Sequence, residues 1–113
     1  MLEITNNDVS HLGDKECYNL LYFTASWCGP CKRIYPLIDT LSEGLDSDII
    51  DIYKVDIDEN EELAEKLNIK SVPTFFLYHQ KQYINQCGGS DIKKVKELLT
   101  TNIKNKSENN DNE

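Results

Sequence analysis

The most informative stretch of the chain covers residues 20–34 and reads LLYFTASWCGPCKRI. It opens with a continuous apolar run, Leu20–Phe23, which is typical of a strand covered on both faces, as in a parallel sheet. A helix is predicted to follow over Gly29–Leu45, and Pro36 inside it is expected to produce a kink. The apolar side chains that should face the core recur at steps of three and four residues, namely Ile34, Leu37, Ile38, Leu41 and Leu45.

The other predicted elements are shorter. Four further apolar or alternating runs are predicted to be strands: Leu2–Thr5, Ile49–Asp56, Thr74–Tyr78 and Gln82–Cys87. Three more helices are predicted after residues that can cap them: Asp8–Cys17 after Asn6 or Asn7, a short helix after Asn60, and a last helix after Asp91.

The order of these elements predicts the topology. Helices between the first strands imply that those strands are parallel. Only three residues separate the last two strands, which must therefore pair as an antiparallel hairpin. The sequence thus predicts an α/β fold, with a central mixed five-stranded sheet flanked by about four helices. One domain should cover residues 1–104, and residues 105–113, which contain no apolar side chain, are expected to form a disordered polar tail.

Composition and charge exclude several classes of protein. The chain has 113 residues, of which 39% are hydrophobic and 28% charged, as in a soluble globular domain. Charged or amide residues interrupt every apolar run, so we expect no membrane span. The net charge is −8, and the window from Glu43 to Glu62 holds nine acidic residues and one basic residue, a surface that repels nucleic acid. The N-terminus does not resemble a secretory signal, so we expect a cytoplasmic, reducing location.

Cys28 and Cys31 carry the chemistry that the sequence suggests. Two residues separate them at the predicted strand-to-helix junction, so the sulfur atoms can meet in a small ring or face one electrophile in turn. Cys28 precedes the helix, where free N–H groups and the helix dipole can lower the pKa of a cysteine from about 8.5 to roughly 3.5–7.5. Lys32 and Arg33 add positive charge. The spacing predicts that Cys28 attacks and that Cys31, one turn inside and more buried, resolves.

The segment Trp-Cys-Gly-Pro-Cys-Lys at residues 27–32 resembles the active-site motif of thioredoxins, and the resemblance extends from Leu2 to Ile103. A bare Cys-x-x-Cys would be weak evidence, but further landmarks of the family match in order and spacing. They are Pro36 in the helix, the cis-proline segment Val72-Pro73-Thr74, Gly88 after the last strand, and Lys54 with Asp58 on the central strand and at its exit.

The resemblance implies a thioredoxin fold and dithiol–disulfide exchange with protein substrates. Cys28 would attack a substrate disulfide to give a mixed disulfide, and Cys31 would then attack Cys28 and release the reduced substrate. Val72 would offer its backbone to an extended substrate segment, as one added strand. No bound cofactor is implied, and a flavin-containing reductase drawing on NADPH would supply electrons. The residues expected to contact substrate are Trp27, Gly29, Pro30, Val72, Pro73 and Gly88.

Tyr22 departs from the family pattern, because thioredoxins usually carry a buried aspartate six residues before the first cysteine. That aspartate helps to take the proton from the second cysteine, whereas a phenol with a pKa of about 10 is a poor base at pH 7. Either Tyr22 is a core aromatic whose hydroxyl finds one partner, or resolution by Cys31 is slowed or uses water or another carboxylate. Lys54, which loses its usual anionic partner, should reach solvent, bond to Tyr22 or have a lowered pKa. Tyr22, Lys54 and Asp58 are therefore expected to modulate the site.

Two cysteines and two histidines lie outside the motif. Cys87, beside Gly88, is either a half-buried apolar residue or a third redox thiol that could link two copies of the chain, and Cys17 is expected to pack in the core. We expect no metal site, because the chain has no second close pair of cysteines and His11 and His79 are isolated. A monomer is expected, with a Cys87-linked dimer as the alternative.

Three functions are consistent with these observations. A protein-disulfide reductase of the thioredoxin type is favoured, because Gly29-Pro30 between the cysteines resembles the pair found in reducing thioredoxins. The first alternative is an oxidase or isomerase with the same fold. The second is a binding subunit that uses the groove of the fold and turns over slowly, although such a module would not need Cys28, Cys31 and Pro73.

Overall fold

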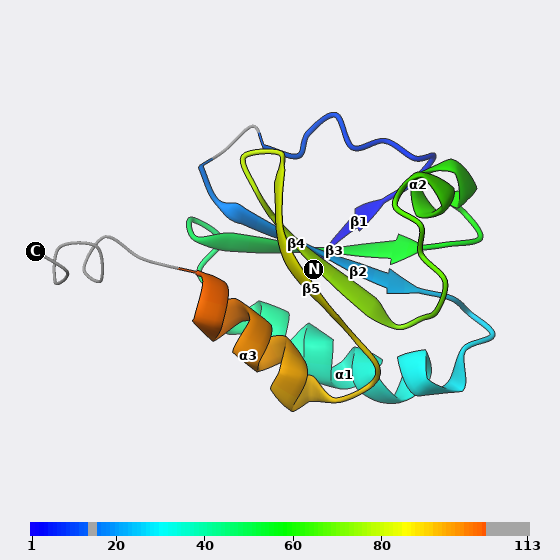
Figure 1. Ribbon diagram of the computed structural model, residues 1–113. Coiled ribbons are helices and arrows are strands. Elements are labelled where there is room, and N and C mark those ends of the chain that lie inside the picture. The colour runs from blue at the N-terminus through cyan, green and yellow to red at the C-terminus, as the bar shows by residue number, and fades with distance from the viewer. Residues whose placement is uncertain (14–15, 104–113) are drawn as a thin grey trace, which may run out of the picture.

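The computed structural model describes residues 1–13 and 16–103, which form one sheet with helices on both faces (Figure 1). The strands are β1 (Leu2–Ile4), β2 (Tyr18–Thr24), β3 (Ile50–Asp56), β4 (Thr74–His79) and β5 (Gln82–Gly88). The helices are α1 (Gly29–Glu43), α2 (Glu61–Lys66) and α3 (Ile92–Asn102). All five predicted strands are present, each with ends within two residues of the predicted ones.

The strand order in the sheet is β1-β3-β2-β4-β5. β1, β3 and β2 run parallel, whereas β4 is antiparallel to β2 and β5 is antiparallel to β4. The parallel neighbours β2 and β3 are joined through α1, which supplies the crossover that a parallel pair needs. This arrangement confirms the predicted mixed five-stranded sheet with a C-terminal hairpin.

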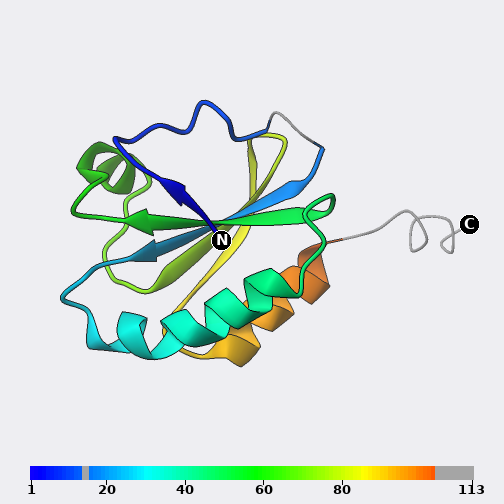
Figure 2. The same cartoon turned by 180° about the vertical axis from the view of Figure 1, so that it is seen from behind.

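The central strand β2 is covered on both faces, as its unbroken apolar run predicts. Leu20 and Tyr22 pack into one apolar core with residues of α1 and α3, and Leu21 and Phe23 pack into a second with Leu63 of α2. Views from opposite sides show α1 and α3 side by side on one face of the sheet and α2 on the other (Figures 1 and 2). Two cores therefore hold the strand that leads into the cysteine motif.

The helix predicted over Asp8–Cys17 is wrong, because its described residues form turns, bends and irregular chain, with residues 14–15 outside the described part. The Asp8 carboxylate accepts hydrogen bonds from the N–H and the hydroxyl group of Ser10, at 3.0 and 2.6 Å. Such local bonds from Asp and Ser side chains compete with helix formation. The described chain thus has three helices instead of about four, and none of them is long and apolar enough to cross a membrane. The predicted tail, residues 105–113, also lies outside the described residues.

Two asparagines join the first loop to the turn between β3 and α2. Asn60 takes the N-cap position of α2, but its side chain makes no capping bond. Its amide instead donates to the carbonyl oxygens of Ile4 (3.0 Å) and Asp56 (2.9 Å), and its oxygen accepts the N–H of Asn7 at 2.8 Å. Asn7 in turn accepts the N–H of Leu63 at 2.9 Å, so it caps α2 from 56 residues away. The fully buried Asn60 therefore ties β1, β3 and the first loop together.

We expect Asn60→Ala to lower the free energy of unfolding by about 2–4 kcal/mol, because it leaves two carbonyl groups and one N–H without their partner. Asn7→Gly removes only the distant cap and keeps the φ of 58°, so it should cost about 1 kcal/mol. Urea unfolding followed by circular dichroism measures both losses. Asn85→Ala, at an exposed position on β5, is the matched control and should change the value by less than about 0.5 kcal/mol. If Asn60→Ala lowers the free energy of unfolding no more than this control does, the role of Asn60 in connecting β1, β3 and the first loop is contradicted.

Candidate active site

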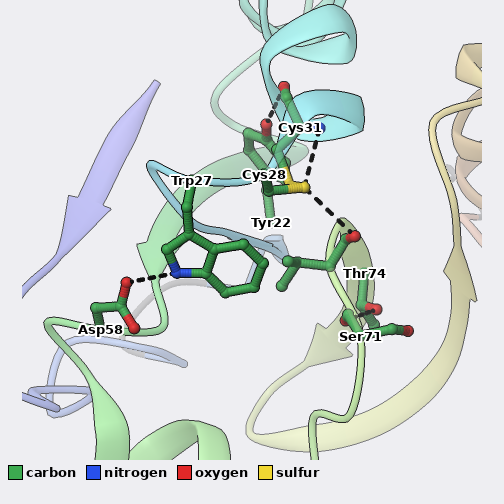
Figure 3. Close-up of a disulfide and its surroundings, with 8 residues drawn as sticks. Tyr22, Trp27, Cys28, Cys31, Asp58, Ser71 and Thr74 are labelled. Carbon is green, nitrogen blue, oxygen red and sulfur yellow. Dashed lines mark hydrogen bonds between the residues drawn. A yellow bond between two sulfur atoms is a disulfide. The ribbon is translucent and has the colours of Figure 1, made fainter.

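Cys28 and Cys31 lie where β2 leads into α1. The strand ends at Thr24, and Cys28 takes the N-cap position of the helix. Pro30 follows at the start of α1, where the N–H that proline lacks would have no partner within the helix. The two cysteines form a disulfide with Cα atoms 5.2 Å apart, within the usual range for such bonds (Figure 3). The predicted pair is therefore assembled at the predicted junction.

The sulfur of Cys28 receives a backbone hydrogen bond from the first turn of α1. The N–H of Cys31 donates to Cys28 Sγ at 3.2 Å (Figure 3). The same turn contains no acidic side chain, and Lys32 and Arg33 are exposed beside it. Because the free N–H groups and the helix dipole favour negative charge, this junction stabilises a thiolate at Cys28 once the disulfide is reduced.

A small cluster of apolar side chains packs against the disulfide. Cys28 and Cys31 are 5% and 1% exposed, and both belong to a cluster with buried Ala25 and partly buried Ile57 and Val72. Sequence reasoning missed Ala25 and Ile57, since each is one ordinary apolar residue just past a strand end. Their position follows from the parallel register, which brings the ends of β2 and β3 to the same edge of the sheet.

The loop that precedes β4 lies against Cys28. Its Val72–Pro73 peptide bond is cis, as predicted, and the Val72 carbonyl oxygen lies 3.5 Å from Cys28 Sγ. The hydroxyl group of Thr74 donates to the Ser71 carbonyl oxygen at 2.7 Å, which closes the loop on itself (Figure 3). A backbone carbonyl is therefore held beside the sulfur of Cys28.

The remaining residues predicted to contact substrate lie around this loop and the start of α1. Gly88 ends β5 opposite Thr74, and the N–H of the next residue donates to the Pro73 carbonyl oxygen at 3.0 Å. Gly29 and Pro30 are exposed at the start of α1. The fold thus brings the predicted set from three separate parts of the chain to one end of the sheet.

Trp27 is 66% exposed, and its indole is fixed from one side. The Nε1–H group donates to the Asp58 carboxylate at 2.9 Å (Figure 3). The N–H of Asp58 donates in turn to the Asp56 carboxylate at 2.8 Å, so the loop after β3 orients the carboxylate that holds the ring. Trp27 and Asp58 were each predicted from the sequence as separate site residues. The hydrogen bond between them was not predicted, because they lie 31 residues apart and no local pattern links them.

Tyr22 lies in the core beneath the disulfide. Its side chain is 1% exposed and stacks on Phe75 with ring centroids 5.1 Å apart. Its hydroxyl group donates to the Cys31 carbonyl oxygen at 3.2 Å (Figure 3). Burial raises the pKa of Tyr22 above its ordinary value of 10.0, so the phenol stays neutral at pH 7. The ring packs and donates one bond, and it cannot serve as a base.

Lys54 lies opposite Tyr22 in the register of β2 and β3. Its ammonium is 5.3 Å from the centroid of the exposed Tyr35 ring on α1, a cation–π contact. The side chain borders a cavity of about 180 Å³ behind Cys31. The residues that line this cavity are Thr24, Ala25, Ser26, Cys31, Lys32, Tyr35, Lys54 and Asp56.

The two remaining cysteines are not part of the disulfide. Cys17 is buried, and Cys87 is half-buried on β5, opposite Phe75. Burial raises the pKa of the Cys87 thiol, although the charge of Lys94 opposes the shift. Within residues 1–13 and 16–103, no three His, Cys, Asp or Glu side chains gather in an arrangement that could hold a metal ion.

The chain matches the thioredoxin family model over residues 4–105. It is 36% identical to the thioredoxin of Malassezia sympodialis over 88 residues, which cover 78% of this chain and 82% of that protein. The structure of Fasciola hepatica thioredoxin superposes with a TM-score of 0.83 at 28% identity, covering 90% of this chain and 99% of that one. The structure of reduced Schistosoma mansoni thioredoxin superposes with a TM-score of 0.82 at 35% identity, covering 90% of this chain and 97% of that one.

The family model extends over nearly all of the described chain and includes the segment that carries the disulfide. The match in sequence and the match in fold agree with the site geometry, in which a helix N-terminus supports one of two paired cysteines. The chain therefore belongs to the thioredoxin family and is a thiol–disulfide oxidoreductase.

Proposed function

We propose that this oxidoreductase works in the reducing direction on protein disulfides, with Cys28 as the nucleophile and Cys31 as the resolving thiol. The observation that carries the proposal is the Cys31 N–H aimed at Cys28 Sγ at the start of α1. A thiolate held there attacks a substrate disulfide and expels one substrate sulfur as a thiolate. Cys31 then attacks Cys28 Sγ, which releases the second substrate sulfur and leaves the Cys28–Cys31 disulfide.

The substrate segment is proposed to lie along the loop that contains Val72. Its carbonyl group, close to Cys28 Sγ, would pair with the backbone of an extended chain, as in the addition of one strand to a sheet edge. Backbone pairing is tolerant of sequence, which suits an enzyme that accepts many proteins. The surface proposed to contact substrate consists of Trp27, Gly29, Pro30, Val72, Pro73 and Gly88.

The partners are proposed by analogy with thioredoxins. A flavin-containing reductase drawing on NADPH would regenerate the dithiol, and the chain itself would need no bound cofactor, because electrons pass through its disulfide. Cys17 and Cys87 take no part in the disulfide, and cysteines that stay reduced in the same chain favour a reducing, cytoplasmic location. The raised pKa of Cys87 keeps that thiol protonated at neutral pH, which favours a monomer over a Cys87-linked dimer.

Cysteine substitutions test the assignment of roles. Cys28→Ser should reduce the rate of insulin disulfide reduction with dithiothreitol to the uncatalysed level, because the nucleophile is lost. Cys31→Ser should still attack, and without dithiothreitol it should accumulate a mixed disulfide with insulin on non-reducing gels. The double variant Cys17→Ser/Cys87→Ser is the control and should keep full activity. Substantial activity in Cys28→Ser, or a mixed disulfide that forms through Cys31 first, would contradict the proposed order.

Tyr22→Asp is expected to speed release of substrate from the mixed disulfide by about tenfold or more, because a carboxylate would replace a neutral phenol beneath Cys31. Stopped-flow single-turnover kinetics measure this step, and circular dichroism verifies that the variant is folded. Tyr22→Asn removes the same ring without adding a base and is the matched control. Release in Tyr22→Asp that is equal to or slower than release in Tyr22→Asn would show that a missing base does not limit resolution.

A further inference from the structure

Resolution by Cys31 requires a path for one proton. Only a thiolate attacks a disulfide efficiently, so the Cys31 thiol must lose its proton as it attacks Cys28. Cys31 is 1% exposed, and bulk water does not reach it freely. Tyr22, which touches the Cys31 carbonyl oxygen, is neutral and already donates its own proton there. Either water or a side chain other than Tyr22 therefore receives the proton.

The cavity behind Cys31 offers such a path. Its volume of about 180 Å³ exceeds the roughly 10–15 Å³ that one water molecule requires, and its lining is polar enough to bond water. It joins Cys31 to the side chains at the end of β3, and the residues that line it do not include Val72, whose carbonyl oxygen lies against Cys28. Water in this space can relay a proton between groups that do not touch.

The sheet register places a carboxylate in this cavity. Tyr22 lies opposite Lys54, and Thr24 lies opposite Asp56, so all four side chains are on the face of the sheet that α1 covers. Among the described residues that line the cavity, Asp56 is the only carboxylate. One of its oxygens accepts the Asp58 N–H at 2.8 Å, which fixes the orientation of the group.

The other charged and titratable groups at the cavity support an anion there. Lys54 is held over the Tyr35 ring, and Lys32 lies at the start of α1, so two ammonium groups and one carboxylate border the same space. Tyr22 adds no charge, because its pKa is raised. The two ammonium groups offset the electrostatic cost of one negative charge in this space as that charge passes from the carboxylate to the Cys31 sulfur.

We propose that Asp56 accepts, through water in this cavity, the proton that Cys31 releases when it resolves the mixed disulfide. The inference rests on the reductase function proposed above. The Cys31 S–H bond breaks and its proton passes through water to the Asp56 carboxylate. The sulfur forms a bond to Cys28 Sγ, the bond from Cys28 to the substrate sulfur breaks, and the substrate leaves as a thiolate. Two electrons thus pass from the dithiol to the substrate, and Asp56 later returns its proton to solvent.

Stopped-flow kinetics with dithiobis(nitrobenzoate) separate the two steps, because each step releases one coloured thiolate. The protein is used with Cys17→Ser and Cys87→Ser, so that only Cys28 and Cys31 react. Asp56→Asn should leave the first, bimolecular release unchanged within about twofold and slow the second release about tenfold or more at pH 7. Asn keeps the acceptor for the Asp58 N–H. The matched control is Glu59→Gln, which removes the same charge from an exposed side chain three residues away and should leave both releases unchanged.

The pH profile separates a proton acceptor from a structural role. The second release in Asp56→Asn should approach the parent rate as the pH rises toward 9, because hydroxide can take the proton there. Added imidazole should restore part of the rate of this release at pH 7. The role of Asp56 would be overturned, with the reductase function still standing, by either of two results. The second release in Asp56→Asn could be as fast as in the parent protein, or its rate could be lower by a factor that neither pH nor imidazole changes. If the parent protein releases only one thiolate, resolution by Cys31 fails, and the proposed function fails with it.

Discussion

The N–H of Cys31, directed at the sulfur of Cys28, is the interaction on which the site depends. It exists because a strand buried on both faces delivers the chain to a helix N-terminus at one fixed place. The unpaired donors there must be satisfied, and a sulfur anion satisfies them better than a neutral thiol does. The two apolar cores around β2 supply the rigidity, since neither the strand nor the first turn can shift without disturbing packed side chains on both faces.

The surroundings of the disulfide divide into two sides with different tasks. On one side, Trp27 is exposed and the Val72 carbonyl group approaches Cys28, which suits contact with another polypeptide. On the other side, charged groups at the end of β3 border a cavity behind Cys31 that is large enough to hold water, which suits proton transfer. Asp58 links the two sides, because its carboxylate holds the Trp27 indole while its backbone N–H orients Asp56.

Local patterns predicted the strands, the hairpin and the cysteine junction, because each depends on neighbouring residues and on a strong period or turn signal. The family resemblance, in turn, pointed to the cis bond before Pro73. Contacts between segments that lie far apart in the chain could not be predicted, because no local pattern links the residues involved. Asn60 was expected to cap α2, yet it binds β1, and the cap comes from Asn7. Leu37 matched the apolar period of α1 but is 48% exposed, since periodicity places a residue at the margin of a face only approximately.

The most direct test of the account is the reduction potential of the Cys28–Cys31 couple at pH 7, measured against graded thiol buffers with Cys17 and Cys87 replaced by serine. A reductant of this family should lie near about −270 mV, the value typical of thioredoxins. A value near about −180 mV, typical of protein disulfide isomerase, would contradict the reducing direction. The absence of a reversible couple would contradict the assignment of Cys28 and Cys31 as the catalytic pair.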